Sequence, residues 1–332
     1  MTHLARRRML AAAATGLLSA SLGVAASAPA TAAPRTASAC TLSTLPFPTD
    51  VYRATADAVD PTGRFTAGTA LRVGDDGNQL LLLVWDRRQL TTVESPIADS
   101  VADVNTDGVV VGNGWVDGIS RPWVYRGGVV ELLPVPPGAA AASAINGAGD
   151  IVGWREEADT GRKVALRWPA ARPGTVEVLD APIDAVPQGI TENGTIVGTA
   201  GAFAEWTGWV RHPDGRVEAL TVPGARTTLI DAAQGHWAVG RVDLGGVTQV
   251  KVRWDLRDGS WSRLADELTW VADVNSHGTV VGGDRIARNG TSRLLPGGGE
   301  RVTVGARAIS DTGTVVGFRN DGRVTPVRWS GC

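Results

Sequence analysis

The sequence is poor in the residue types that most often carry chemistry or attach a protein to nucleic acid. Among 332 residues there are only two cysteines, Cys40 and Cys332, and four histidines. Lys163 and Lys251 are the only lysines among 32 basic residues, and the net charge of −2 excludes a strongly basic nucleic-acid binder. No apolar run beyond the N-terminus is long enough to span a membrane. We therefore expect no nucleic-acid partner and no membrane partner.

Recognisable catalytic motifs are also missing. The sequence has neither His-Glu-x-x-His nor Gly-x-Ser-x-Gly, and no cysteine is left free to pair with a histidine. Beyond the N-terminus the histidines are His212, His236 and His277. His236 and His277 fall in turns of adjacent copies, but two histidines without a third ligand are weak evidence for a metal site. We accordingly predict a protein that is not an enzyme and has no metal and no cofactor. Two carboxylates converging across a pocket, as in a glycosidase, would not be visible at this level.

The N-terminus has the pattern of a signal peptide. Arg6, Arg7 and Arg8 precede an apolar run over residues 11–26, and Ala30-Thr31-Ala32 offers small residues for cleavage. We predict a signal peptide over 1–32, a short segment over 33–39 and a secreted, extracellular protein. The paired arginines followed by Met9 and Leu10 resemble the twin-arginine pattern, and an ordinary Sec signal is the alternative. Export exposes Cys40 and Cys332 to an oxidising environment, which favours a disulfide between them.

Glycine, by contrast, is abundant, and many of the 42 glycines fall in a phrase repeated seven times. The phrase runs from an aliphatic residue through a small polar residue and a turn glycine to a second glycine, often as Gly-x-Val-Val-Gly. The second glycines recur roughly every 35 to 45 residues. They are Gly68, Gly112, Gly153, Gly198, Gly240, Gly282 and Gly317.

The phrase predicts a β-hairpin. Apolar residues alternate on both sides of the turn, and the first glycine supplies the positive φ that a tight turn needs. The second glycine indicates a bulge or a close backbone approach. The polar residue before each turn is expected to accept a bond from backbone N–H groups two or so residues later. These residues are Asp60, Asn105, Asn146, Thr191, Asp231, Asn275 and Ser310.

Each hairpin is followed by two further strand patterns. The first ends in a tryptophan at one shared position in six copies, and copy six has Asp284-Arg285-Ile286 instead. The second ends in Leu-Pro or Val-Pro in several copies, and proline suits a strand end. Four short strands per repeat indicate one blade of a β-propeller. We therefore predict an all-β, seven-bladed β-propeller that occupies 40–332 as a single domain.

The two ends of this domain are predicted to complete one blade. The seventh copy stops after its tryptophan strand, and residues 40–46 have the pattern of the missing fourth strand. The N-terminal strand would then complete the last blade and close the ring. This closure would bring Cys40 and Cys332 together as a structural disulfide.

The hairpin phrase and the tryptophan strand after it resemble the extracellular HAF-repeat family over essentially all of 40–332. The Ala-Phe pair that names that family is replaced here by Pro122-Trp123 and similar sequences. In size, export signal, repeat number and closure the chain is also similar to secreted propellers that act on extracellular metalloproteases. That resemblance implies a non-catalytic monomer that binds an extracellular protein, a thermolysin-like metalloprotease, and provokes its autolysis.

Binding residues are expected among the tryptophans outside the repeated position. Trp206, Trp237 and Trp270 are the candidates, and Trp270 is expected near the first strand of the sixth copy, a strand expected to line the central channel. The main alternative function is a lectin or hydrolase-type propeller that binds carbohydrate or a small molecule. A weaker alternative is a substrate of an extracellular transglutaminase, since glutamines outnumber lysines. The donor candidates are Gln79, Gln89, Gln188, Gln234 and Gln249.

Overall fold

The computed structural model describes residues 40–74, 77–246 and 249–332, so the predicted signal peptide over 1–32 and the segment 33–39 lie outside it. Within these ranges every regular element is a β-strand and no helix occurs, as the glycine-punctuated, alternating sequence predicts. Accordingly, the described part of the chain has no helix long and apolar enough to cross a membrane.

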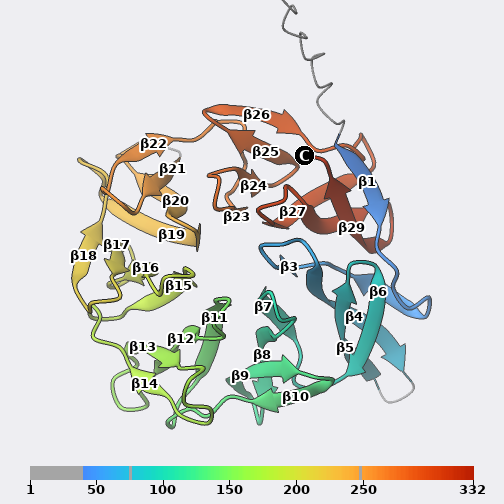
Figure 1. Cartoon of the computed structure of the whole chain (residues 1–332), viewed down its shortest axis with the longest axis horizontal. Coiled ribbons are helices and arrows are strands. Elements are labelled where there is room, and N and C mark those ends of the chain that lie inside the picture. The colour runs from blue at the N-terminus through green and yellow to red at the C-terminus, as the bar shows by residue number, and fades with distance from the viewer. Residues whose placement is uncertain (1–39, 75–76, 247–248) are drawn as a thin grey trace, which may run out of the picture. The chain divides into compact units, whose positions relative to one another are not determined.

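Five sheets of four antiparallel strands follow one another along the chain (Figure 1). The first is β7 (Ser100–Val104), β8 (Val110–Val116), β9 (Ile119–Arg126) and β10 (Val129–Leu132). The second is β11 (Ala140–Ile145), β12 (Ile151–Glu156), β13 (Lys163–Trp168) and β14 (Glu177–Val178). The third is β15 (Val186–Ile190), β16 (Ile196–Ala200), β17 (Thr207–Arg211) and β18 (Val217–Leu220). The fourth is β19 (Thr227–Gln234), β20 (Trp237–Asp243), β21 (Val250–Asp255) and β22 (Trp261–Arg263). The fifth is β23 (Asp273–Val274), β24 (Val280–Gly282), β25 (Arg285–Arg288) and β26 (Thr291–Leu294).

The remaining strands form a nine-stranded sheet that joins both ends of the described chain. Its order is β27-β28-β29-β2-β4-β5-β6, with β1 paired to β29 and β3 paired to β4. The strands are β1 (Thr41–Thr44), β2 (Val51–Ala54), β3 (Ala58–Val59), β4 (Phe65–Gly74), β5 (Gly77–Asp86), β6 (Gln89–Glu94), β27 (Thr303–Ile309), β28 (Val315–Asn320) and β29 (Val324–Ser330). β1 runs antiparallel to β29, with Thr41 opposite Ser330, and the predicted Cys40–Cys332 disulfide is confirmed.

The sheets are arranged in a ring, with β3, β7, β11, β15, β19, β23 and β27 innermost (Figure 1), and residues from these strands line a central cavity, called the channel below. Because successive strands are antiparallel, their connections alternate between two faces of the ring. We call the face with the turns after the first and third strands of each sheet the turn face. The loop face carries the loops after the second strands and the connections between sheets.

The hairpin phrase folds as predicted at most copies. The Asn105 side-chain oxygen accepts bonds from the N–H groups of Asp107 (3.1 Å) and Val109 (3.0 Å), and Asn275 does the same two and four residues on. The seven turn glycines have φ between +61° and +87°. At each second glycine a Cβ would overlap a backbone carbonyl in the neighbouring inner strand or just before it, as Gly112 would with Ser100. Because glycine has no side chain, the inner strand can bulge against its partner strand at these positions.

Two copies depart from the predicted turn. Asp231 was expected in the turn but lies at a bulge of β19, where it pairs with Arg241. The strand continues to Gln234, so Gln234 occupies the turn position and the prediction for Asp231 is wrong. In the other copy, the Thr191 hydroxyl donates to the side chain of Asn193 instead of accepting. The oxygen of Asn193 accepts from Thr195 and closes that turn.

The repeated tryptophans pack between neighbouring sheets, but they occupy two registers and not one. Trp85, Trp168, Trp254 and Trp329 lie opposite the residue two before the second glycine. Trp123 and Trp209 lie opposite the glycine itself, and their rings cover it. All six are buried. The indole N–H of Trp168 donates to the carbonyl of Pro134 (2.7 Å) in the preceding sheet, and Trp85 and Trp329 bond in the same way.

The sheet without a repeated tryptophan fills the same space differently. Ala287 stands in β25 opposite Val280, at the register of Trp168. Trp237, at the start of β20 in the preceding sheet, packs against the apolar cluster that contains Ala287. Its ring also contacts the guanidinium of Arg253 at 4.2 Å and the ring of His236 at 4.6 Å. Trp237 is therefore a packing residue between two sheets.

Candidate functional site

Exposed apolar side chains are distributed unevenly over the ring. Of the large apolar residues that the structure describes as exposed, five lie on outermost strands: Val129, Leu132, Val178, Trp261 and Leu294. The others all lie at the loop-face ends of strands or in loop-face connections. They are Tyr52, Val73, Trp115, Ile119, Ile183, Phe203, Leu244 and Trp270. Exposed apolar groups gathered on one face are typical of an interaction surface.

Two of the most exposed of these residues lie in or beside a pocket on the loop face. Phe203 is 85% exposed and Ile183 is 67% exposed. The two segments that carry them are joined by a bond from the N–H of Gly201 to the carbonyl of Ile183 (3.2 Å). Phe203 meets the half-buried Trp206 edge to face, with ring centroids 5.1 Å apart. The two rings line a cavity of about 430 Å³ between β13, β15 and β19.

Charged groups complete the lining of this pocket. Arg241 forms two bonds to the carboxylate of Asp231, at 3.0 and 3.1 Å. The Lys163 ammonium lies 3.5 Å from the centre of the Trp154 ring, and its backbone N–H donates to Asp184. The pocket thus joins an aromatic wall to donors and acceptors, a combination that suits an amphipathic ligand or the side chains of a partner protein.

The central channel is acidic. A cavity of about 360 Å³ is lined by Asp103, Asp231 and Asp273 from three inner strands, by Asp57 directly before β3, and by Arg307 from β27. The channel wall displaces much of the water around the half-buried Asp103 and Asp273, and this desolvation raises the pKa of each to about 7. The same cause raises the pKa of Asp57 and of Asp231.

Two of the channel acids connect neighbouring sheets. One oxygen of Asp103 accepts from the N–H of Ile145 in the next sheet at 2.9 Å, and Asp273 accepts from Ile309 at 2.8 Å. Each also accepts from the next residue of its own strand. These bonds give both carboxyl groups a structural role in the channel wall.

The structure separates the three tryptophans predicted to bind a ligand. Trp206 lies in the loop-face pocket, as a binding residue would. Trp237 fills the space between two sheets. Trp270 is 44% exposed in the connection before β23, and it is not among the residues lining the channel, where Trp154 is found instead. Trp270 thus lies close to β23, the innermost strand of its sheet, as expected, but its own side chain does not line the channel.

The five candidate glutamines are also spread over the molecule. Gln79 and Gln89 are exposed on β5 and β6, where an acyl-transfer enzyme has access. Gln188 and Gln234 are half-buried at the channel, and Gln249 is half-buried before β21. Of the five, only Gln188 and Gln234 line a common cavity in the described structure, and both are half-buried there.

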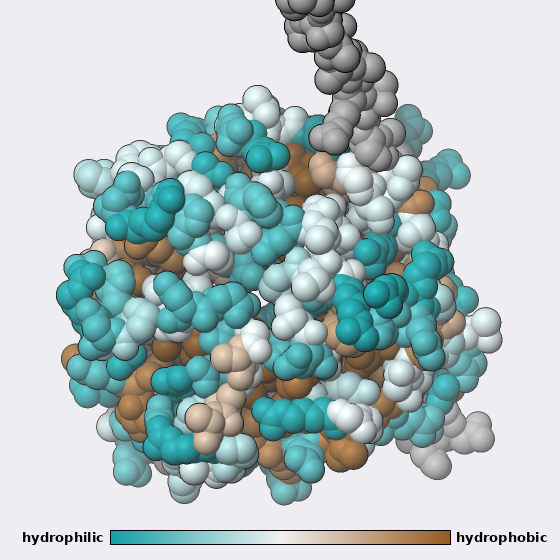
Figure 2. Space-filling view, viewed as in Figure 1, coloured by the Kyte–Doolittle hydropathy of each residue, from teal (hydrophilic) through white to brown (hydrophobic). Residues whose placement is uncertain are grey.

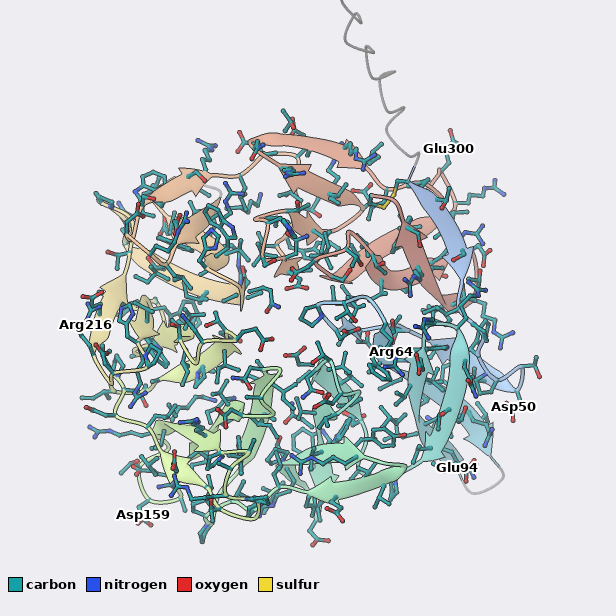
Figure 3. The ribbon with its side chains drawn as sticks, in the orientation of Figure 1. Asp50, Arg64, Glu94, Asp159, Arg216 and Glu300 are labelled. Carbon is teal, nitrogen blue, oxygen red and sulfur yellow. A yellow bond between two sulfur atoms is a disulfide. The ribbon has the colours of Figure 1, made fainter. Side chains whose placement is uncertain are left out.

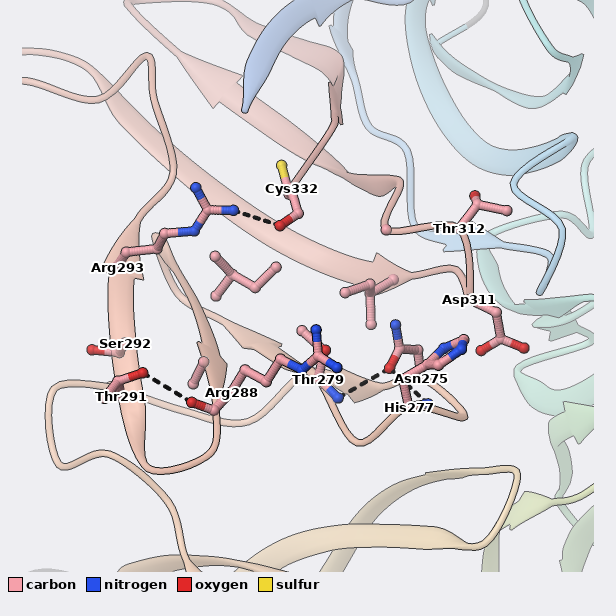
Figure 4. Close-up of a pocket in the computed structure, with 14 residues that line it drawn as sticks. Asn275, His277, Thr279, Arg288, Thr291, Ser292, Arg293, Asp311, Thr312 and Cys332 are labelled. Carbon is pink, nitrogen blue, oxygen red and sulfur yellow. Dashed lines mark hydrogen bonds between the residues drawn. The ribbon is translucent and has the colours of Figure 1, made fainter. Parts of the chain in front are cut away.

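Grooves between neighbouring sheets open on the turn face. One, of about 390 Å³, lies between the β25–β26 hairpin and the turns after β23 and β27 (Figure 4). The Arg288 side chain extends into it, and Arg293 donates to the carbonyl oxygen of Cys332. His277 and Asp311 lie on the opposite wall. This groove carries both signs of charge and no exposed large apolar side chain.

Sequence reasoning missed Phe203 and Ile183, the most exposed aromatic and one of the most exposed aliphatic residues on the loop face. Phe203 lies within Gly201-Ala202-Phe203-Ala204, a small-residue loop directly after the buried strand β16. A large apolar residue in a short loop of small residues has little chance of burial, and that pattern was available in the sequence.

The likeness to solved structures concerns the fold. No family model and no curated protein matches the chain. The β-propeller domain of the Trilobed protease from Pyrococcus furiosus superposes with a TM-score of 0.60 at 13% identity, over 86% of this chain and 95% of that domain. A prolyl endopeptidase gives 0.59 at 14% identity, over 84% of this chain and 50% of that chain. Puromycin hydrolase gives 0.56 at 17% identity, over 83% of this chain and 51% of that chain.

The chain therefore spans about half the length of the endopeptidase and the hydrolase, and nearly the whole propeller domain of the Trilobed protease. At these identities the likeness concerns architecture alone. Together with the ring of four-stranded sheets, it identifies the described part of the chain as an all-β protein with the β-propeller fold.

Proposed function

We propose that the chain is a secreted, non-catalytic propeller that binds another extracellular protein through its loop face. The observation that carries this proposal is the gathering of exposed apolar side chains there, with Phe203, Ile183 and Trp115 all more than 60% exposed. Large aromatic side chains that become buried in a partner supply much of the affinity of protein interfaces. Because the side chains lie on loops held by rigid sheets, their positions are fixed before binding.

The proposal includes a ring of seven blades closed by β1. It is supported by the division of the nine-stranded sheet at β2 into two groups of four, β27–β28–β29–β1 and β3–β4–β5–β6. Added to the five separate sheets, these two groups would make seven. The Cys40–Cys332 disulfide joins the ends of the outermost strand and its neighbour at this seam.

As partner we propose a thermolysin-like metalloprotease whose autolysis is provoked by the contact. This step rests on the resemblance in size, export signal, repeat number and closure to the dispase autolysis-inducing protein, a secreted propeller that acts on a metalloprotease. The loop face supplies the surface for such a contact. Binding there would not require catalysis by this chain.

The test is a binding measurement with a catalytically inactive thermolysin-like protease, followed by mass spectrometry of fragments of the active enzyme. We expect a saturable complex and accelerated protease autolysis. Phe203→Ala removes an 85%-exposed ring that supports no core cluster, and we expect it to weaken the complex about tenfold. Trp261→Ala is the matched control, because Trp261 is 42% exposed on an outermost strand away from the loop face.

Three results would separate the parts of the proposal. If a complex forms but protease autolysis is not accelerated, the proposed loop-face interaction stands and the proposed effect on autolysis is refuted. The absence of any complex would remove the protease as a partner. Equal losses of affinity in the Phe203 and Trp261 variants would remove the loop face as its binding surface.

A second candidate function, carbohydrate binding, is favoured by the Trp206 pocket. An indole beside Asp184, Gln188 and Arg241 offers a stacking face and hydrogen-bonding groups to a sugar ring. Titration of the chain with neutral oligosaccharides, followed by tryptophan fluorescence, tests this function. Trp206→Phe would remove the signal, and an unchanged signal in that variant would exclude the pocket.

A further inference from the structure

Four arginines meet in one pocket on the turn face, at the seam between β1 and β6. The pocket has a volume of about 600 Å³ and is lined by Arg64, Arg87, Arg88 and Arg328. The remaining lining residues are Ser43, Thr62, Gly63 and Ser330, so no acidic side chain lines it. Figure 3 labels Arg64 between the inner strand β3 and the outer strand β6, and in Figure 2 strongly hydrophilic side chains gather over this region.

The four guanidinium groups come from separate segments that the closed sheet brings together. Arg64 precedes β4, and Arg87 and Arg88 form the turn between β5 and β6. Arg328 belongs to β29, directly opposite Ser43 of β1. The pocket therefore exists only while β1 stays paired with β29.

The charges in the pocket are poorly compensated. Arg64 pairs with Asp86 through two bonds of 2.9 and 2.7 Å, and Arg87 lies 3.9 Å from the same carboxylate. Arg88 donates only to neutral oxygens, those of Ser43 (3.3 Å) and Thr44 (3.0 Å). Arg328 donates to the hydroxyl of Thr314 (3.1 Å). In the described structure neither Arg88 nor Arg328 has a carboxylate partner.

The nearest buried acid does not supply the missing charge contact. Both oxygens of Asp60 accept bonds from their own turn, from Thr62 and Phe65. Burial lowers the pKa of Arg328 and the neighbouring Arg88 lowers it further, although the charge of Asp60 acts in the opposite direction. Like charges held together in a partly desolvated groove destabilise one another unless an anion lies between them.

We propose that this pocket binds a multiply charged oxyanion, a phosphate or sulfate group. Guanidinium groups bind such groups through paired N–H···O bonds, and Arg88 and Arg328 have donors to spare. The hydroxyl of Ser330 adds a short donor beside the same space. By contacting β1, β29 and both turns beside β4 and β5, the anion would stabilise the seam of the ring.

The experiment uses the full chain and isothermal titration with sodium phosphate and sodium sulfate, at an ionic strength held constant with sodium chloride. We expect saturable one-to-one binding of at least one of them and much weaker binding of acetate. The same anion should raise the thermal midpoint, because a ligand that binds only the folded state stabilises it. Comparing the affinities for phosphate and for sulfate shows which of the two groups a natural ligand would carry.

Arg88→Gln and Arg328→Gln are each expected to weaken binding about tenfold, the effect of one charge-assisted hydrogen bond. Arg88 is exposed, so its replacement tests the site without disturbing the core. Arg301→Gln is the matched control: it removes the same charge from an exposed arginine in the connection before β27, on the loop face. No saturable binding of phosphate or sulfate, or an equal loss in the Arg301 variant, would overturn the proposal. Either result would leave the loop-face function untouched, because the two sites lie on opposite faces.

Discussion

Removing the Cys40–Cys332 disulfide should destabilise the whole domain. The perturbation is the double variant Cys40→Ser/Cys332→Ser, which leaves no stray thiol. The cysteines are 292 residues apart, and constraining a loop of that length stabilises the folded state by about 5 to 6 kcal/mol in the chain-entropy model. For a domain of this size we expect the thermal midpoint to fall by roughly 10 °C.

The assay is thermal unfolding followed by circular dichroism, with the reduced wild-type chain as a second route to the same state. Hydrogen exchange should locate the change at the seam, with loss of protection in β1 and β29 before any other strands. The four residue pairs between β1 and β29 remain available without the disulfide, so the folded ring itself should persist at low temperature. A midpoint within 2 °C of wild type, given a proven disulfide in the wild-type chain, would refute the reasoning.

Two further predictions concern the channel and the hairpins. Because the pKa values of Asp103 and Asp273 are about 7 in the folded chain and 3.8 when unfolded, the unfolded state binds fewer protons between those values. The free energy of unfolding should therefore fall as pH rises from about 4 to about 7, by up to about 1.4 kcal/mol per pH unit for each group. Urea unfolding at pH 5 and pH 7 measures this, and Asp273→Asn should reduce the slope; a rise in stability over this range would contradict the assignment. Gly112→Ala places a Cβ against the Ser100 carbonyl and the Trp123 ring, and should cost about 3 kcal/mol or more. Gly299→Ala, where the new Cβ meets no atom, should be nearly neutral in the same unfolding assay, and equal effects would exclude the steric explanation.

Much of the fold was predictable because the residues that form each turn lie next to one another within each repeat. Each turn needs a glycine with positive φ and an Asn or Asp acceptor three residues before it, and the following strand needs a glycine packed against a carbonyl. These requirements involve neighbouring residues, so they can be recognised in the sequence. The register within a strand is not local. Trp123 and Trp168 look alike in sequence, yet they lie two residues apart in register, because the neighbouring sheet decides where an indole fits.

The same limit explains the error at Asp231. Ile230-Asp231 matches the repeated aliphatic–polar pattern, but β19 continues past it to Gln234, and pairing with Arg241 fixes Asp231 in the channel wall. Trp237 fills space that is left because Ala287 stands where other sheets have a tryptophan. The two residues belong to different sheets, so their relation is not visible in the sequence. Arg64, Arg88 and Arg328 could not be grouped from sequence at all, because the seam that unites them joins positions more than 200 residues apart.

The pairing of β1 with β29 also sets the order of events in folding. Among the described strands β1 is synthesised first, but its only partner is synthesised last, so β1 has no sheet to join until nearly all of the chain is present. Contacts so distant along the chain form slowly, because the entropy cost of closing the intervening loop comes before the stabilisation that strand pairing provides. Joining the two ends should be the final and rate-limiting step. Until then both unpaired edges are open to strands from other molecules.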